Sequence, residues 1–364
     1  MKKSQMMYKH EFIVLLTSII SLNAMLTFPL RMTQLAGTAS WLLAVVILLF
    51  AFIGVVILHK LYEPFVGKDI LDVAMFTWGR KLQVPIALLA LAQVLYGGIV
   101  VARQFGESLN IIALPNSPIG FVIFLLMLGS GIVACQGLKT VARVAFIFYK
   151  VVSGGILLIL LGVIDKFKII NLFPLLGLKN GITIKNGFVG ISWFSGILAY
   201  FLFIPFLDDK EKGKEVLYKT VGISGLFMFL VTLVYQGVFS YPASKKQFIP
   251  LYSLSRSIQQ GGKIERIEAI FFIIWVISAL TFIAVAALVS AYIFRRLFDL
   301  KYSKPIILCM IVIIFSVSLM YKNIIGEETY FVKLYRRVSY ITSYIVPMLL
   351  FALANVKNRK VNAK

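Results

Sequence analysis

The chain has 364 residues, of which 60% are hydrophobic and 14% are charged, with a mean hydropathy of +0.92 and a formal net charge of +22. This composition excludes a soluble globular protein of this length and predicts a polytopic α-helical membrane protein, because long apolar runs recur from end to end. Lys and Arg fall mostly between these runs, where they orient helices against anionic lipid. We therefore predict a membrane-lipid partner and no nucleic-acid partner.

Ten apolar segments follow one another along the chain, and we predict that each is a membrane-spanning helix of one domain formed by residues 1–364. They lie at residues 11–35, 38–60, 82–109, 119–137, 142–164, 187–207, 216–241, 265–294, 303–321 and 332–356. With a cytoplasmic N-terminus, the inner segments hold 21 Lys and Arg residues and the outer segments hold 14. This bias predicts that both termini are cytoplasmic.

The first span carries polar residues at its centre, where Ser21, Asn23 and Thr27 are followed by Pro29. Lipid offers no hydrogen-bond partners, so a polar break at this depth is tolerated only where protein or a cavity covers it. We predict that helix 1 is broken and binds a small ligand there. Alternatively, Asn23 bonds another helix and Pro29 ends the span. The predicted ligand contacts are Asn23, Ala24, Met25, Leu26 and Thr27.

The sixth span has the same interrupted character, with Ser192, Ser195 and Gly196 near its centre. Ten spans divide into two five-helix halves of opposite orientation, and such inverted repeats place a ligand site where the first helix of each half breaks. We predict repeats at about 11–164 and 187–356, with helix 6 broken. The predicted ligand contacts of the second half are Ser192, Ser195, Gly196 and Tyr200.

Residues near the middle of two further spans complete the candidate site. Gln93, Tyr96 and Val100 are three or four residues apart in the third span, so they share one helix face. Ser278 and Thr281 lie in the middle of the eighth span, which continues with alanines that allow close helix packing. These two hydroxyl groups either line the site or bond neighbouring helices.

Charged residues also lie within predicted spans. Arg103 and Glu107 are four residues apart near the outer end of the third span, where we expect a structural salt bridge, with an ion site as the alternative. Lys150 lies about 12 Å inside the fifth span by helical rise. It either reaches the membrane surface with its long side chain or provides a fixed cation beside the site.

No pattern of residues indicates catalysis, a metal centre or a cofactor. His10 and His59 lie near membrane edges, both cysteines lie in or beside apolar spans, and nucleotide-binding and metalloprotease motifs are absent from the sequence. We therefore predict that the chain is not an enzyme and binds neither a metal nor a cofactor.

Several short stretches resemble the B subunits of GerA-type spore germinant receptors, which belong to the amino acid–polyamine–organocation transporter superfamily. Each stretch is weakly specific alone, but their order and spacing together are more specific. They are Leu26-Thr27-Phe28-Pro29, Gly37-Thr38-Ala39-Ser40-Trp41, Asn171-Leu172-Phe173-Pro174, Asp208-Asp209-Lys210-Glu211-Lys212 and Ile264-Glu265-Arg266-Ile267-Glu268-Ala269-Ile270-Phe271 running into Trp275.

This resemblance implies a LeuT-like fold and a sensor of a small nutrient, such as an amino acid, that works with A and C subunits in the inner membrane of a spore. The chain departs from the family where Leu22 and Ala24 replace glycines and Ile197 replaces a glutamate. These departures predict a narrow, weakly polar pocket and argue against proton coupling. An amino-acid permease and a signal-relay or ion-release subunit without its own ligand remain alternative interpretations.

Overall fold

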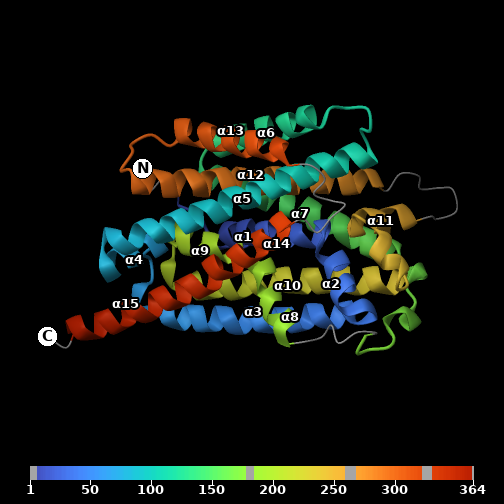
Figure 1. Ribbon diagram of the computed structural model, residues 1–364, viewed down its shortest axis with the longest axis horizontal. Helices are drawn as coiled ribbons and strands as arrows, with labels where there is room; N and C mark the ends of the chain where they lie inside the picture. The colour runs from blue at the N-terminus through green and yellow to red at the C-terminus, as the bar shows by residue number, and fades with distance from the viewer. Residues whose placement is uncertain (1–5, 178–183, 259–267, 322–329, 363–364) are drawn as a thin grey trace.

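The computed structural model describes residues 6–177, 184–258, 268–321 and 330–362, and it gives only the backbone of residues 23–26, 184, 330–331 and 362. Within this part of the chain, the structure is a bundle of helices that run mostly along one long axis (Figure 1). The α-helices are α1 (Lys9–Leu26), α2 (Phe28–Ala36), α3 (Ser40–Tyr62), α4 (Ile70–Trp78), α5 (Arg80–Ile112), α6 (Ile119–Cys135), α7 (Leu138–Gly162), α8 (Ile184–Gly190), α9 (Ile197–Phe203), α10 (Gly213–Val238), α11 (Pro250–Ser257), α12 (Glu268–Leu297), α13 (Lys304–Met320), α14 (Tyr330–Tyr340) and α15 (Val346–Asn362).

Each of the ten segments predicted as a span contains one helix or a run of consecutive helices. Six helices among the described residues are long and apolar enough to cross a membrane, or seven if the bent pair Lys185–Phe194 and Ile197–Phe206 forms one span. The apolar helices α6 and α13 are shorter. The all-helical, multi-pass membrane architecture predicted from the sequence is therefore confirmed.

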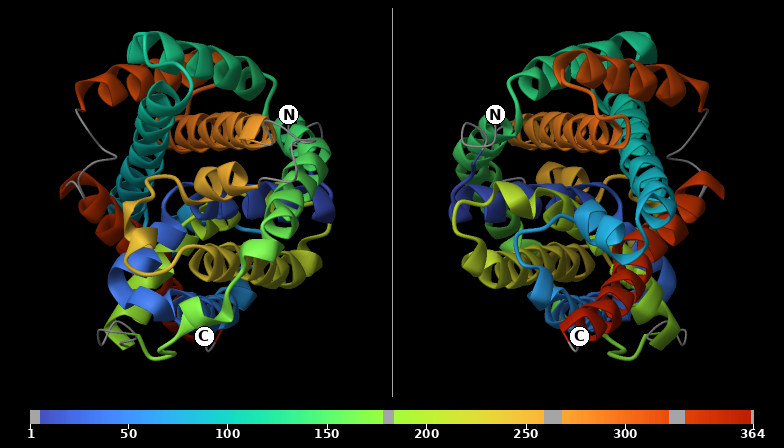
Figure 2. Two further views of the ribbon diagram at one scale, coloured as in Figure 1. Left: turned by 90° about the vertical axis from the view of Figure 1, so that its right-hand side faces the viewer. Right: turned by 90° about the vertical axis from the view of Figure 1, so that its left-hand side faces the viewer.

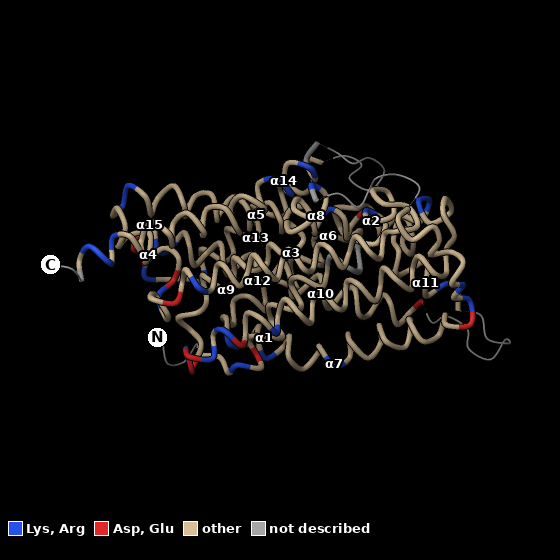
Figure 3. The backbone as a smooth tube through the Cα atoms, turned by 90° about the horizontal axis from the view of Figure 1, so that it is seen from below, with Lys and Arg blue, Asp and Glu red and all other residues tan. Residues whose placement is uncertain are grey.

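The outer helices present apolar side chains to their surroundings. Figures 1 and 2 show α6 and α13 side by side along one edge of the bundle. Their exposed residues include Phe121, Phe124, Leu125, Leu128, Ile132, Leu308 and Val312. A continuous apolar surface of this kind would be costly in water, so these side chains contact lipid. Figure 3 shows most charged positions toward the two ends of the long axis, whereas the basic positions of α14 lie nearer its middle.

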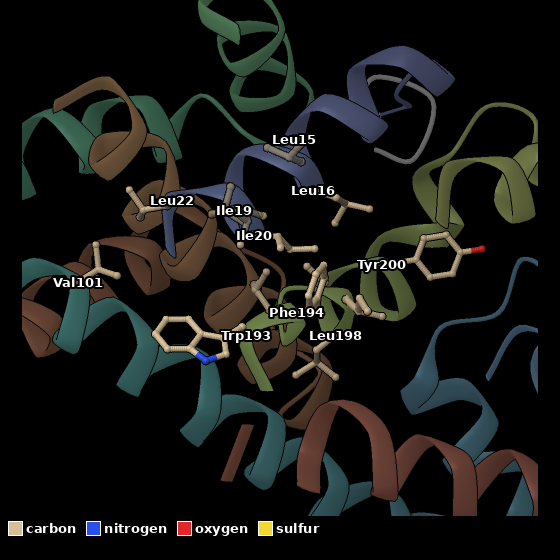
Figure 4. Close-up of a cluster of buried hydrophobic side chains, with 14 of the residues drawn as sticks. Leu15, Leu16, Ile19, Ile20, Leu22, Val101, Trp193, Phe194, Leu198 and Tyr200 are labelled. Atoms are coloured by element: carbon tan, nitrogen blue, oxygen red, sulfur yellow. The ribbon is translucent and has the colours of Figure 1, made fainter. Parts of the chain in front are cut away.

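Helix α1 lies inside the bundle, where it packs against α7, α10 and α12. Its apolar side chains are buried on every face, as expected for a helix that is surrounded by other helices. Ile19 and Ile20 face Phe194 and Leu198, which flank the break in the sixth span (Figure 4). Burial of α1 thus brings the first and sixth spans together.

The first span is broken at Thr27, whose backbone leaves the helical conformation between α1 and α2 (φ −129°, ψ −8°). The alternative in which Pro29 ends the span is wrong, because α2 continues to Ala36. Pro29 lies in the first turn of α2, where its missing N–H group costs no helical hydrogen bond. The non-helical backbone is confined to Thr27. This is consistent with Leu22 and Ala24, which stand where glycines would allow the helix to unwind further.

The sixth span is interrupted more extensively. A 3₁₀ turn, η6 (Ile191–Phe194), follows α8, and Ser195 and Gly196 then separate it from α9. The two halves are bent by 45°. The last span also departs from regular α-helix, because a π-helical turn, η10 (Ile341–Ile345), joins α14 to α15. Both predicted helix breaks are therefore confirmed, and an irregular turn occurs in the last span as well.

Candidate functional site

A small cavity of about 50 Å³ lies beside the break in the sixth span, and we refer to it as the central cavity. Its wall combines α1, α5, the break before α9, α12 and α14. The lining residues are Ile19, Gln93, Val94, Gly97, Ser195, Gly196, Leu198, Ala199, Phe282, Val285, Ala286, Val289 and Tyr335. The structure thus brings together Gln93, Ser195 and Gly196, three of the residues predicted as ligand contacts.

Two glycines allow this wall to form. A Cβ atom on Gly196 would lie 2.8 Å from Ile20 Cγ1 and 3.1 Å from Ile19 Cγ2, so only glycine lets the broken helix approach α1 without displacing side chains. A Cβ atom on Gly97 would lie 2.9 Å from the hydroxyl oxygen of Tyr335. Gly196 therefore allows the close approach of α1 to the break, and Gly97 leaves room for the Tyr335 side chain at the cavity wall.

Gln93 is the centre of a buried polar network that connects three helices. Its Nε2 donates to Ser343 Oγ at 2.8 Å, and Thr342 Oγ1 donates to its Oε1. Ser343 Oγ donates in turn to the backbone carbonyl of Ser195 at 3.0 Å. Buried polar groups need partners of this kind, so Gln93 ties the break in the sixth span to the π-helical turn η10. Such turns occur often at functional sites.

Larger cavities lie elsewhere along the bundle, and two of them exceed 600 Å³. The basic vestibule, about 630 Å³, is lined by residues that include Thr27, Ser192, Trp193 and five basic side chains. The aromatic vestibule, about 690 Å³, is lined by residues that include Phe203, Phe206, Tyr292 and Tyr302. Thr27 and Ser192, predicted as ligand contacts, therefore border the basic vestibule and are not among the residues that line the central cavity.

Arg336 and Trp193, which both line the basic vestibule, form an aromatic and cationic stack. The guanidinium group of Arg336 lies 3.3 Å from the ring centroid of Trp193, and the indole of Trp193 packs edge-on against Phe28 at 5.2 Å. Tyr335, the residue before Arg336, lines the central cavity. One turn of α14 thus contributes to both cavities.

Several predicted contacts lie outside the wall of the central cavity. Tyr96 packs against the rings of Tyr321 and Tyr335, Val100 is buried in the bundle, and Tyr200 stacks on Phe12 at 5.9 Å. The hydroxyl groups of Ser278 and Thr281 donate to carbonyl oxygens of α12 itself, each at 2.8 Å. The predicted contacts Asn23, Ala24, Met25 and Leu26 are helical in their backbone, and their side chains lie outside the described part of the chain. The binding roles of all these residues stay predictions.

The charged residues of the predicted spans are also apart from the cavity. Arg103 and Glu107 form a buried ion pair within α5, with 2.6 Å between Arg103 Nε and Glu107 Oε1. Lys150 is exposed on the surface of α7, where it can reach the membrane boundary. Lys150 does not line the central cavity, and none of the described lining residues is acidic.

Sequence reasoning missed Tyr335 and the stretch of α12 that lines the cavity, including Phe282 and Ala286. These residues carry no polar pattern that would single them out. Thr342 and Ser343 were also missed, although two adjacent hydroxyl residues in an apolar span are a usable signal. No cluster of His, Cys, Asp and Glu suited to a metal ion occurs in the described ranges.

Comparison with known proteins identifies relatives over almost the whole chain. The family model described as spore germination protein matches residues 7–325. The chain is 22% identical to spore germination protein KB of Bacillus subtilis (strain 168), over 99% of this chain and 97% of that protein. It is 26% identical to spore germination protein YndE of the same organism, over 94% of this chain and 96% of that protein.

Solved structures of transporters share the fold. MhsT in complex with L-phenylalanine has a TM-score of 0.67 at 15% identity, covering 94% of this chain and 87% of that chain. Mhp1, a nucleobase-cation-symport-1 family transporter in a closed conformation with bromovinylhydantoin bound, has a TM-score of 0.62 at 13% identity, covering 88% and 74% of the two chains. The structural likeness to these transporters shows that the chain has a LeuT-like membrane fold. Because the family match extends over most of the sequence, the chain belongs to the spore germination protein family.

Proposed function

We propose that the chain is the B subunit of a GerA-type germinant receptor that binds a small nutrient, an amino acid in the first instance, and thereby triggers spore germination. It lies in the inner membrane of the spore with both termini in the cytoplasm, and A and C subunits are its partners. The observation that carries this proposal is the central cavity, which a member of the spore germination family forms at the break in its sixth span. The chain acts as a receptor, without catalysis.

The central cavity offers the groups that a zwitterion needs, but little room. Its polar lining groups include the side-chain amide of Gln93 and the hydroxyl of Tyr335, and the rest of its wall is largely apolar. At about 50 Å³ it is much smaller than the roughly 300–1,000 Å³ of typical ligand pockets. A ligand must therefore favour a state with a larger cavity. Such differential affinity is what allows a nutrient to shift a conformational equilibrium and produce a signal.

The network around Gln93 provides a route for that signal. A ligand that bonds to the Gln93 amide competes with Ser343 and Thr342, which belong to the π-helical turn η10. The last span continues from this turn to α15, the final helix of the chain. We therefore expect ligand binding to change how α15 packs against α3 and α4, its neighbours at the predicted cytoplasmic end.

Spores that carry Gln93→Leu test the proposal. We expect their germination, followed by the fall in optical density, to need a much higher nutrient concentration than wild-type spores. Lys150→Gln, on the exposed face of α7, is the matched control and should leave the dose response unchanged. Equal dose responses for Gln93→Leu and wild type, at equal protein levels, would contradict the proposed site.

A permease is the second candidate, and the pair of vestibules favours it. A carrier that alternates between two openings needs a route from each side to a central site, and the two vestibules provide space for such routes. Uptake of labelled amino acids into liposomes that contain only this chain would support the permease. Nutrient binding without uptake would support the receptor.

A further inference from the structure

The aromatic vestibule combines basic side chains with an apolar wall. Its basic residues come from the end of α12, the loop that follows and the start of α13, and they are Arg295, Arg296, Lys301 and Lys304. These four are all the Lys and Arg residues of segment 295–304, which we predict to be cytoplasmic. The segment lies at the same end of the bundle as the end of α15 (Figure 1). One short stretch of the chain therefore brings four positive charges to one cavity.

The described carboxylates near these cations already have basic partners. Asp72 is the only acidic residue among the described lining residues, and it forms an ion pair with Arg296. The buried carboxylate of Asp69 lies 3.7 Å from the same guanidinium group. Asp299, in the loop itself, pairs with Arg80 at 3.0 Å. With Asp69 and Asp72 both counted, the four basic residues of the cavity still exceed the carboxylates by two.

Three of the four cations are not occupied by the residues that the structure describes. No ion pair, side-chain hydrogen bond or aromatic contact within the described ranges involves the side chains of Arg295, Lys301 and Lys304. Lys301 and Lys304 are exposed, and Arg295 is half-buried. In the basic vestibule, by contrast, most of the basic side chains interact with other residues of the chain. The aromatic vestibule is therefore the cavity whose cations are left for an anionic ligand.

The rest of the wall suits a hydrocarbon chain. Leu138 from α7, Phe203 from α9, Leu288 from α12 and Ile307 from α13 contribute apolar side chains to a cavity of about 690 Å³. A hydrated inorganic anion gains nothing from such a surface, whereas an acyl chain fills it without exposing apolar groups to water. The combination of unoccupied cations and an apolar wall matches an amphipathic anion.

The loop between α12 and α13 has the composition of a segment at the membrane interface. Phe298, Leu300 and Tyr302 are exposed, and the charged Lys301 lies between the last two. Aromatic side chains are enriched at the level of lipid headgroups, and a tyrosine there keeps its ring in an apolar layer and its hydroxyl in a wet one. The loop composition therefore places the unoccupied cations at the depth of lipid phosphates.

We propose that the aromatic vestibule binds an anionic phospholipid, with its phosphate on Arg295, Lys301 and Lys304 and an acyl chain along the apolar wall. Basic pockets between membrane helices at a cytoplasmic surface bind anionic headgroups by this chemistry. The site is separate from the nutrient site in the central cavity and does not depend on it. Because α9 and α12 line both cavities, the bound lipid stabilises the present arrangement of these two helices.

The test uses the full chain in phosphatidylcholine nanodiscs that contain increasing mole fractions of phosphatidylglycerol. Native mass spectrometry counts the phosphatidylglycerol bound to the chain, and the mole fraction at half-saturation measures its affinity. We expect saturable binding that Lys301→Gln and Lys304→Gln each weaken about fivefold, as expected for one basic residue near an anionic headgroup. Lys60→Gln is the matched control, because it removes the charge of an exposed lysine in the last turn of α3 that does not line this cavity.

Two further variants separate the headgroup from the acyl chain. Arg295→Lys retains the charge and should bind phosphatidylglycerol more tightly than Arg295→Gln. Cys135→Phe keeps every charge but fills part of the cavity from a half-buried position, so it should also weaken binding while the melting temperature in phosphatidylcholine stays unchanged.

Three results would overturn the proposal. Equal effects of Lys60→Gln and Lys301→Gln would mean that the basic residues provide only general surface charge. Equal retention of phosphatidylcholine and phosphatidylglycerol by the wild type would show that the cavity does not select an anionic lipid. Displacement of phosphatidylglycerol by inorganic phosphate as readily as by more of the lipid would identify a free anion as the occupant.

Discussion

Replacing Gly97 by Ala adds one methyl group at the wall of the central cavity. The new Cβ atom would lie 2.9 Å from the hydroxyl oxygen of Tyr335, which is too close for a relaxed contact. The contact is made at the far end of a flexible side chain, so Tyr335 moves and the helices keep their places. Alanine is also better than glycine inside a helix by roughly 0.5–1 kcal/mol, so we expect no loss of stability.

The expected loss is in ligand affinity. The cavity measures about 50 Å³, so a methyl group and a displaced Tyr335 ring occupy space that a ligand needs. The crowding then arises only when the ligand is bound, and we take its cost as that of overpacking a well-packed interior, about 1–3 kcal/mol. Since about 1.4 kcal/mol corresponds to a factor of ten, the dissociation constant of the nutrient should rise about 5- to 150-fold.

The assay begins with a thermal-shift screen of L-amino acids on the purified wild-type protein, and calorimetry then measures the dissociation constant of the amino acid that binds. Gly154→Ala is the matched control, because an added Cβ atom there has no neighbour within 4 Å. It should leave the dissociation constant unchanged. If Gly97→Ala also binds with the wild-type constant, the ligand does not occupy the central cavity.

Three further predictions test the packing and the charges of the fold. Gly196→Val places atoms where even a Cβ atom would meet α1 at 2.8 Å, and it should destabilise the protein by about 1–3 kcal/mol, seen as a lower melting temperature. Burial raises the pKa of the Asp69 carboxyl above its usual value. The folded state then binds more protons than the unfolded state, so the melting temperature should fall as pH rises from about 4, and Asp69→Asn should remove this dependence. Glu107→Gln leaves the Arg103 charge buried without its ion-pair partner and should lower the free energy of unfolding by about 3–5 kcal/mol. The double variant Arg103→Met/Glu107→Leu should recover most of this loss. Equal thermal inactivation of the single and double variants would contradict this reasoning.

The sequence was sufficient to predict the helices and the two breaks, because both depend on local chemistry. A membrane helix must satisfy its own backbone groups, so runs of apolar residues predict spans and polar interruptions predict breaks. The role of Pro29 was less certain from sequence. A proline can follow a helix or begin one, and only the packing of α2 shows that here it begins one.

The site could be predicted only where polar residues marked it. Gln93, Ser195 and Gly196 stood out from apolar neighbours, and the structure places them together. On α12, the predicted Ser278 and Thr281 satisfy their hydroxyl groups on their own helix, and the apolar turn that follows lines the cavity. Which turn of a helix faces a cavity depends on how helices are shifted along one another, and residue types do not specify that shift.

The same limit applies to Tyr335. It belongs to the last span, far in sequence from Gly97, and the two residues meet only because α14 packs against α5. By contrast, the basic side chains of the basic vestibule are visible in the sequence as an excess of Lys and Arg in the predicted outer segments. That excess became interpretable once the structure showed five of them around one cavity.

The most direct test of the central claim is equilibrium binding of labelled L-amino acids to the purified chain, compared between wild type and Gln93→Leu. Our account predicts saturable binding of one class of amino acid by the wild type, and strongly weakened binding by Gln93→Leu although the protein remains folded. Lys150→Gln should bind as the wild type does. Binding of the same amino acid with equal affinity by the wild type and Gln93→Leu, or failure of every L-amino acid to bind the wild type, would contradict the account.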